Sequence, residues 1–269
     1  MVMLWNNLIF LKIKKQFRCQ LMKFNRVVEK LKKERAITLA IETAEKNNLR
    51  WNKDIEVIFA ACCDNPALAP KLGGKNDNEQ QVFTKWISKY WNAYDNRISS
   101  RISNTPSTVA DPMIKTIIGT KLPYLSNVEL TQIIHAHRLS MSAENILGLF
   151  LEEYLQKNLR TYGWFCGWGE TIKSVDFCHE DGRLMQVKNR SNSENSSSSQ
   201  VRLGTKIEKW HRVDARTGKY MWQDLNDKYS TDKFSEDRFR AFVVNTVNNN
   251  PAALAIETDN LWLDRTKID

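Results

Sequence analysis

The stretch Thr171-Ile-Lys-Ser-Val-Asp-Phe-Cys-His-Glu-Asp-Gly-Arg-Leu-Met-Gln-Val-Lys188 decides the fold of this chain. Its β-branched residues at positions 171, 172 and 175 predict a strand over residues 171–178. The dipeptide Asp181-Gly182 is among the strongest signals for a two-residue hairpin turn. Residues 183–188 are therefore predicted to return as the antiparallel partner of the first strand.

Other elements are predicted on both sides of this hairpin. Ser126 and Glu129 have the spacing of a capping box, which predicts a helix over residues 128–137. A second helix is predicted from Ser142 to Leu159, with Glu144 in its first turn, where the helix dipole favours a carboxylate. Three further patterns predict an aromatic, glycine-rich turn over 163–169, a buried strand over 239–247, and a helix or strand near 252–257.

The amino-terminal half is predicted to be helical. Helical periodicity covers residues 27–47, 52–62 and 79–102, and connections rich in Pro or Gly are expected at 64–77 and 104–123. Four aromatic residues in the third helical stretch have a spacing that favours core packing over base stacking: Trp86, Tyr90, Trp91 and Tyr94. The pattern predicts an α/β (α+β) fold, with a mixed central sheet flanked by helices and a helical amino-terminal half. Residues 22–125 and 126–269 are expected to form one continuous domain.

Composition excludes several classes of protein. With 42% apolar and 10% aromatic residues, 10 Gly and 6 Pro among 269 residues, the chain is an ordinary globular protein and not a collagen, coiled coil or disordered chain. The longest apolar stretch is interrupted well short of the roughly 18–20 residues of a membrane span. Its 5 cysteines show no Cys-x2-Cys spacing, so we expect structural thiols and a reducing, cytoplasmic compartment.

Residues 1–21 are expected to be a leader that is not translated in the native protein. An apolar run there precedes its basic residues, which is the reverse of a secretion signal. Met22 opens an amphipathic helix and is the expected start.

The hairpin also carries the residues expected to perform chemistry. Leu184, Gln186 and Lys188 alternate onto one face of the return strand, beside Asp176 on its neighbour. Burying such polar groups is costly unless they serve each other or an ion. Mg²⁺ prefers a small set of carboxylate and carbonyl oxygens plus water and phosphate oxygens, and it can activate water for attack on a phosphodiester.

Asp176, nine intervening residues and then Gln186-Val-Lys188 resemble the Asp…(Asp/Glu)-x-Lys signature of the PD-(D/E)xK nucleases, with Gln in place of the second acid. The longer contexts Ser142-Ala-Glu-Asn-Ile-Leu-Gly-Leu-Phe-Leu-Glu-Glu-Tyr154 and Gln186-Val-Lys-Asn-Arg-Ser-Asn-Ser-Glu-Asn195 resemble the SinI-type group of type II restriction endonucleases, which cut GG(A/T)CC. The resemblance extends from about residue 129 to the carboxyl terminus and is looser over 22–126.

This resemblance implies roles for individual residues. Asp176 would be the principal Mg²⁺ ligand, the Val187 carbonyl and the Gln186 amide would assist it, and Lys188 would be the catalytic lysine. Glu144 matches the acid that these nucleases often place beside the metal, and Glu170 is the alternative. Because Gln186 carries no charge, the number of metal ions stays open.

The segment after Lys188 is expected to contact DNA rather than to serve as a plain polar linker. Arg reads guanine, Glu accepts from cytosine, and Asn or Ser serves either, which assigns base recognition to Asn189, Arg190, Asn192, Ser193, Glu194 and Asn195. Residues 183–219 hold nine basic and three acidic residues, a net charge of +6, whereas residues 36–269 as a whole are nearly neutral. This local excess suits contact with backbone phosphates by Arg202, Lys206, Lys209 and Arg212.

The sequence thus predicts a type II restriction endonuclease that cuts double-stranded DNA with Mg²⁺ at a short palindrome, expected to be GGWCC. A palindrome is read most simply by a two-fold protein, so a homodimer is expected, with a cognate methyltransferase as a functional counterpart. Two alternatives stay open, namely a repair or junction nuclease of the same fold and a non-catalytic DNA-binding module in which Gln186 marks a decayed site.

Overall fold

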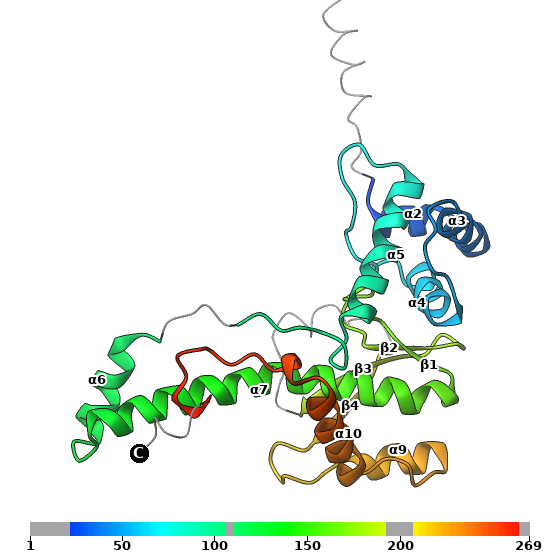
Figure 1. The fold of residues 1–269 in the computed structure, drawn as a ribbon. Coiled ribbons are helices and arrows are strands. Elements are labelled where there is room, and N and C mark those ends of the chain that lie inside the picture. The colour runs from blue at the N-terminus through cyan, green and yellow to red at the C-terminus, as the bar shows by residue number, and fades with distance from the viewer. Residues whose placement is uncertain (1–21, 106–109, 192–206, 264–269) are drawn as a thin grey trace, which may run out of the picture. The chain divides into compact units, whose positions relative to one another are not determined.

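The computed structural model describes residues 22–105, 110–191 and 207–263 (Figure 1). These residues form two compact units, each built from separate parts of the chain. The first unit comprises residues 22–94, 163–186 and 207–209, and the second comprises 95–105, 110–162, 187–191 and 210–263.

A mixed four-stranded sheet has the order β1-β2-β3-β4. Its strands are β1 (Trp164–Cys166), β2 (Phe177–His179), β3 (Leu184–Arg190) and β4 (Ile207–Val213). β2 is antiparallel to both β1 and β3, and it pairs Phe177 with Met185 and Cys178 with Leu184. The predicted hairpin and the predicted mixed sheet flanked by helices are therefore confirmed.

Four helices belong to the first unit: α2 (Phe24–Lys30), α3 (Lys33–Lys46), α4 (Lys53–Asp64) and α5 (Glu79–Asp95), whose last residue is assigned to the second unit. α4 packs on β1 and β2. Phe24, Phe59 and Trp86 form the centre of the core, with Phe24 stacked on Trp86 at 5.1 Å between ring centroids. Trp86 also donates through Nε1 to the carbonyl of Thr171 at 2.9 Å, which ties α5 to the segment before β2. Trp86, Tyr90 and Trp91 are therefore core residues, as their spacing predicted, whereas Tyr94 is only half-buried.

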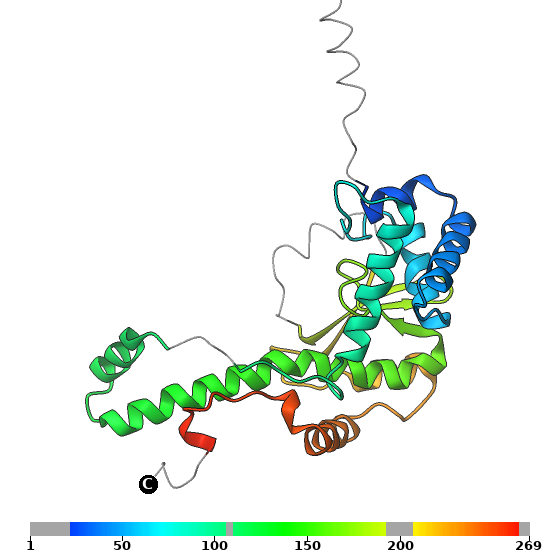
Figure 2. The same cartoon turned by 45° about the horizontal axis from the view of Figure 1, so that its top comes forward.

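The second unit is organised around one long helix, α7 (Asn127–Leu159). α6 (Pro112–Lys121) lies beside its amino-terminal half, and α10 (Glu236–Asn249) packs against it further along (Figures 1 and 2). α9 (Trp222–Tyr229) adds Trp222, which packs with Tyr154 and Phe239 in an aromatic core. Three short 3-10 turns complete the unit: Arg160–Tyr162, Pro251–Ala253 and Leu261–Leu263.

The predicted break between two helices at residues 138–141 is wrong, because α7 runs without interruption. The capping box at its start is confirmed, since the Ser126 hydroxyl accepts from the Glu129 amide and the Glu129 carboxylate accepts from the Ser126 amide. No proline or helix-ending glycine lies at 138–141, so a helix that has begun simply continues. Glu144 consequently lies in the middle of α7, where the dipole argument for its position fails.

One predicted turn and two predicted strands also need correction. Residues 163–169 contain strand β1 in place of a simple turn, while most of 171–178 forms turns, with positive φ angles at Glu170 and Ser174. Residues 239–247 belong to helix α10, because Ser235 caps a helix and the buried residues Phe239 and Thr246 are seven apart. That spacing is two helical turns and is incompatible with strand alternation.

One predicted connection and one predicted helix also differ from the structure. α6 lies inside the stretch expected to be a connection, where Asp111 caps it and Pro112 occupies its first turn. The helix expected over 27–47 is divided at residues 31–32 into α2 and α3. Among the described residues no helix has the length and hydropathy needed to span a membrane.

Candidate active site

Asp176 lies immediately before β2 and is held by main-chain bonds on both sides. Its amide donates to the Met185 carbonyl at 3.0 Å, and its carbonyl accepts from the Gly167 amide at 2.8 Å. Since Phe177 is the paired partner of Met185, two residues of one strand oppose one of the other, the pattern of a β-bulge. The half-buried Asp176 is thereby placed beside the middle of β3, next to the position of Gln186.

Two buried thiols lie behind Asp176 in the first unit. Burial raises the pKa of Cys178, and the nearby Asp176 carboxylate raises it further. Burial also raises the pKa of Cys62 on α4, with Cys178 as the next contributor. Both thiols are therefore protonated packing groups, as expected from the sequence, and Cys62 donates to the Thr171 carbonyl at 3.4 Å. Cys166 is also buried and forms no disulfide with another described residue, and burial raises the pKa of the half-buried Cys63 to about 12.

β3 carries the Gln-x-Lys pair on one strand face. Gln186 is only 6% exposed, whereas Lys188, two residues further along, is half-buried. Alternation gives the two side chains the same orientation, and Val187 the opposite one. Along β3 the buried amide of Gln186 is thus followed by the more accessible ammonium of Lys188. Such an arrangement suits an amide that stabilises a site and a lysine that contacts a charged ligand.

The opposite face of β3 and β4 is packed against helices of the second unit. Arg212 donates from Nε to the Asn189 side-chain carbonyl at 2.9 Å, and its guanidinium pairs with Glu236 of α10. Glu236 also accepts from Trp222 Nε1 at 2.9 Å. Arg212 and Asn189 were both expected to contact DNA. In this structure they contact each other, and the Arg212 side chain is only 11% exposed.

The same contacts establish the register of β3 and β4. Ser191 donates from its amide to the Val213 carbonyl at 3.1 Å, so positions rise together along the two strands, which are parallel here. Because Asn189 and Arg212 share the helix-covered face, alternation turns the neighbouring residues to the other face: Lys188, Arg190, Lys209 and His211. Arg190 and Lys209 are exposed there. The exposed residues of this face are positively charged, whereas Gln186 and the Nε2 atom of His211 on the same face are buried.

The two additional acids lie elsewhere in the chain. Glu144 is exposed in the middle of α7, and its side chain has no hydrogen bond or ion pair within the described part of the chain. Glu170 is exposed in the turn after β1, with a left-handed φ of 54°. The remaining residues expected to read DNA lie outside the described residues: Asn192, Ser193, Glu194, Asn195, Arg202 and Lys206.

The donor set fits a weakly chelated ion and not a preformed cage. Across residues 22–105, 110–191 and 207–263 no cluster of three or more His, Cys, Asp or Glu side chains has metal-binding geometry. Asp176 and the buried Gln186 amide offer hard oxygen atoms, as does the Val187 carbonyl. Mg²⁺ accepts such sparse protein ligation when water and phosphate oxygens complete its octahedron.

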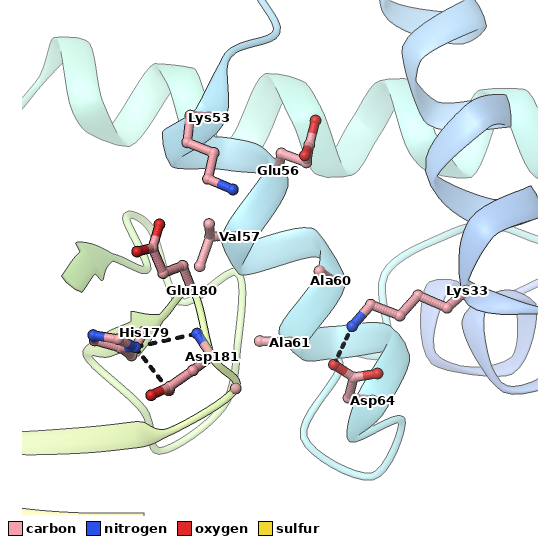
Figure 3. A pocket seen from close by; sticks show the side chains of 11 residues that line it. Lys33, Lys53, Glu56, Val57, Ala60, Ala61, Asp64, His179, Glu180 and Asp181 are labelled. Atoms are coloured by element: carbon pink, nitrogen blue, oxygen red, sulfur yellow. Dashed lines mark hydrogen bonds and ion pairs between the residues drawn. The ribbon is translucent and has the colours of Figure 1, made fainter. Parts of the chain in front are cut away.

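A separate pocket of about 150 Å³ lies in the first unit, between α3, α4 and the β2–β3 turn (Figure 3). Lys33 pairs with Asp64 at one side, and the Asp181 amide donates to His179 Nδ1 at the other. Although burial raises the pKa of Asp181, hydrogen bonds from Arg183 and His179 lower it overall. None of the residues predicted for catalysis lines this pocket, and the sequence marked His179 only as part of a turn.

The sequence of this chain is similar to those of known proteins. Residues 36–249 match the family model of the SinI restriction endonuclease. The chain is 35% identical to the type II restriction enzyme Eco47I of Escherichia coli over 192 residues, covering 70% of this chain and 80% of that enzyme. It is also 35% identical to the type II restriction enzyme SinI of Salmonella infantis over 190 residues, covering 69% and 80%. The chain therefore belongs to the SinI restriction endonuclease family.

Proposed function

We propose that this protein is a type II restriction endonuclease that hydrolyses double-stranded DNA with Mg²⁺ at GGWCC. Membership of the family over residues 36–249 carries the proposal. The orientation of Gln186 and Lys188 on one face of β3, with Asp176 beside that strand in the first unit, supports it. The two relatives are named as type II restriction enzymes, so site-specific cleavage is the activity to test first.

Within this proposal each residue has a chemical task. The Asp176 carboxylate, the Gln186 amide oxygen and the Val187 carbonyl would hold Mg²⁺, which supplies an activated water and Lewis-acid assistance when bound. The Lys188 ammonium would neutralise charge that develops on the phosphate as the phosphodiester bond breaks. Glu144 is the second carboxylate that the family resemblance offers, and Glu170 is its alternative.

DNA contact is proposed along and after the accessible face of β3. Arg190 and Lys209 are exposed there and suit guanine recognition and phosphate contact. The segment with Asn192, Ser193, Glu194 and Asn195 would read base edges, and Arg202 and Lys206 would contact phosphates. Asn189 and Arg212 bind each other on the opposite, helix-covered face, so they would support this surface from behind.

We also propose a homodimer, with the surface formed by α6 and the amino-terminal half of α7 as its interface. α6 buries no residue although half of it is apolar. Exposed large apolar side chains gather on these two helices and the turn between them: Met113, Ile114, Ile117, Tyr124, Val128, Ile133 and Met141. Residues 110–141 carry three basic and two acidic residues, too little charge for a DNA surface. Because a palindromic DNA site has two-fold symmetry, a second copy of this chain is the proposed partner that covers this surface.

Digestion of a mixed-sequence plasmid tests the proposed activity. We expect discrete, Mg²⁺-dependent fragments whose ends map to GGWCC. Lys188→Ala should reduce the rate at least about 10³-fold without loss of duplex binding, because the lysine acts on transition-state charge. Lys46→Ala is the matched control, since Lys46 is exposed at the end of α3. A smear or structure-dependent nicking would favour a repair nuclease, and wild-type protein without Mg²⁺-dependent cleavage would favour a non-catalytic DNA-binding module.

A further inference from the structure

His211 on β4 has a buried ring nitrogen without a partner. Its Nε2 atom is inaccessible to solvent and has no hydrogen bond within the described part of the chain. Buried polar atoms in native proteins are almost always paired, so an unpaired one in a working protein calls for an explanation. One explanation is that a bound ligand supplies the hydrogen-bond partner of His211 Nε2.

Strand geometry places His211 beside Lys188. The bond between Asn189 and Arg212 joins residues at neighbouring positions of the two parallel strands, on the helix-covered face. The residue before each of them, Lys188 on β3 and His211 on β4, therefore points to the opposite face. Adjacent strands are about 4.8 Å apart, so these two side chains are lateral neighbours. All four residues belong to the second unit.

The residues next to His211 on this face indicate which kind of ligand would form this hydrogen bond. Lys188 and Arg190, which belong to the second unit as His211 does, bring positive charge to the same strand face and favour an anion there. An imidazole N–H adds a directed hydrogen bond that an ammonium group, as a compact point charge, does not fix geometrically. A phosphate oxygen accepts both interactions at once.

We propose that His211 Nε2 donates a hydrogen bond to a non-bridging oxygen of the DNA phosphate that Lys188 contacts. His211 is thus a further catalytic residue, which acts by holding the scissile phosphate and forms no covalent intermediate. This assignment rests on the proposed endonuclease function. It gives a role to a residue that the sequence motif does not include.

The test combines protein variants with a change in the phosphate itself. His211→Ala removes the donor, His211→Gln keeps an N–H near the same position, and Lys46→Ala is the control because Lys46 is exposed at the end of α3, outside every proposed site. Binding is measured in Ca²⁺ with a GGWCC duplex that has either its native scissile phosphate, mapped from the cleavage products, or a neutral methylphosphonate there. Cleavage of the native duplex is measured under single turnover in Mg²⁺.

We expect His211→Ala to cleave about 10²-fold more slowly, a loss typical of one donor to the reacting centre. It should bind the native duplex about 10-fold more weakly but bind the methylphosphonate duplex as wild type does, because the two changes remove the same interaction. His211→Gln should recover part of both losses. Equal weakening on both duplexes, or wild-type cleavage, would overturn the assignment.

Two further readouts separate possible failures. If His211→Ala does not fold, imidazole ¹⁵N spectra of wild-type protein decide the matter. A change at Nε2 of His211 on addition of the native duplex, absent with the methylphosphonate duplex, supports the contact, and no change refutes it. Absence of cleavage by wild type would remove the endonuclease proposal itself, whereas normal cleavage by His211→Ala removes only the role of His211.

Discussion

At the scale of single residues, Gln186 is the informative departure from its nuclease signature. An amide replaces an acid at a position that is almost fully buried, beside the half-buried Asp176 in the first unit. A buried carboxylate there would be unfavourable without a cation, whereas a buried amide needs only hydrogen bonds. Under the proposed function, this amide would keep the metal-free fold stable and would bind Mg²⁺ more weakly than a carboxylate does.

Gln186→Glu should reverse this balance. We expect the Mg²⁺ concentration for half-maximal cleavage to fall about 10-fold, which corresponds to about 1.4 kcal/mol of binding energy. In EDTA the melting temperature should drop below that of wild type, and Mg²⁺ should restore it. Gln156→Glu is the control, since Gln156 is equally buried, at 7% exposure, but lies on α7 and outside the signature. A Gln186→Glu variant that Mg²⁺ does not rescue would argue against metal binding at this position.

At the scale of elements, β3 and β4 have two faces with different tasks. One face is anchored by Arg212, Asn189 and Glu236 and is covered by helices of the second unit. The other carries Lys188 and His211. Residues one position apart thus lie on different faces: Arg212 is packed against helices, whereas His211 is the residue proposed to contact the phosphate. The basic run of the sequence is divided between the two faces.

The segment before the last 3-10 turn is attached to α7 by a buried ion pair. Arg138 donates from Nε to Glu257 at 3.0 Å, and Asn260 donates to the same carboxylate at 3.3 Å. Burial by itself would raise the pKa of Glu257, but hydrogen bonds to its own backbone, Asn260 and Arg138 lower it below its usual value of 4.5.

A carboxylate with a lowered pKa stabilises the folded state above its ordinary pKa and loses this effect as pH falls through the lowered value. We therefore expect the melting temperature to fall between about pH 5 and pH 3, and Glu257→Gln to make this fall shallower. Glu45→Gln, at an exposed position of α3, should leave the slope unchanged. The measurement is a series of thermal melts over this pH range, and identical slopes for Glu257→Gln and wild type would contradict the role of the ion pair.

At the scale of the whole molecule, exposed apolar surface is concentrated on α6 and the start of α7. Scattered apolar residues are normal on protein surfaces, but seven large exposed ones between residues 113 and 141 support the proposed interface. α6 is capped by Asp111 and carries Pro112 in its first turn, so it is a well-formed helix with nothing of its own to bury. Covering these apolar residues is the role proposed for the second copy of the chain.

Ile117→Asp should convert the proposed dimer to a monomer. A charge in the middle of an apolar interface remains without a partner, which costs several kcal/mol. We expect light scattering after size exclusion to show half the wild-type mass, with slow or single-strand cleavage of the plasmid. Ile102→Asp is the control, because Ile102 is also highly exposed but lies outside the two helices. A wild-type monomer, or a dimer that survives Ile117→Asp, would remove this interface.

The sequence by itself determined the local features whose physical cause is local. The Asp-Gly turn, the Ser126 capping box and the helical spacing of Trp86 and Tyr90 each depend on residues close together in the chain, and each was predicted correctly. Only the tertiary structure decided the rest. β1 has three residues and exists because β2 supplies its hydrogen-bond partners, and the pairing of Arg212 with Asn189 depends on the register of two strands separated in sequence. The hydrophobic pattern of one strand does not indicate which distant strand pairs with it, so only the tertiary structure identifies the partner.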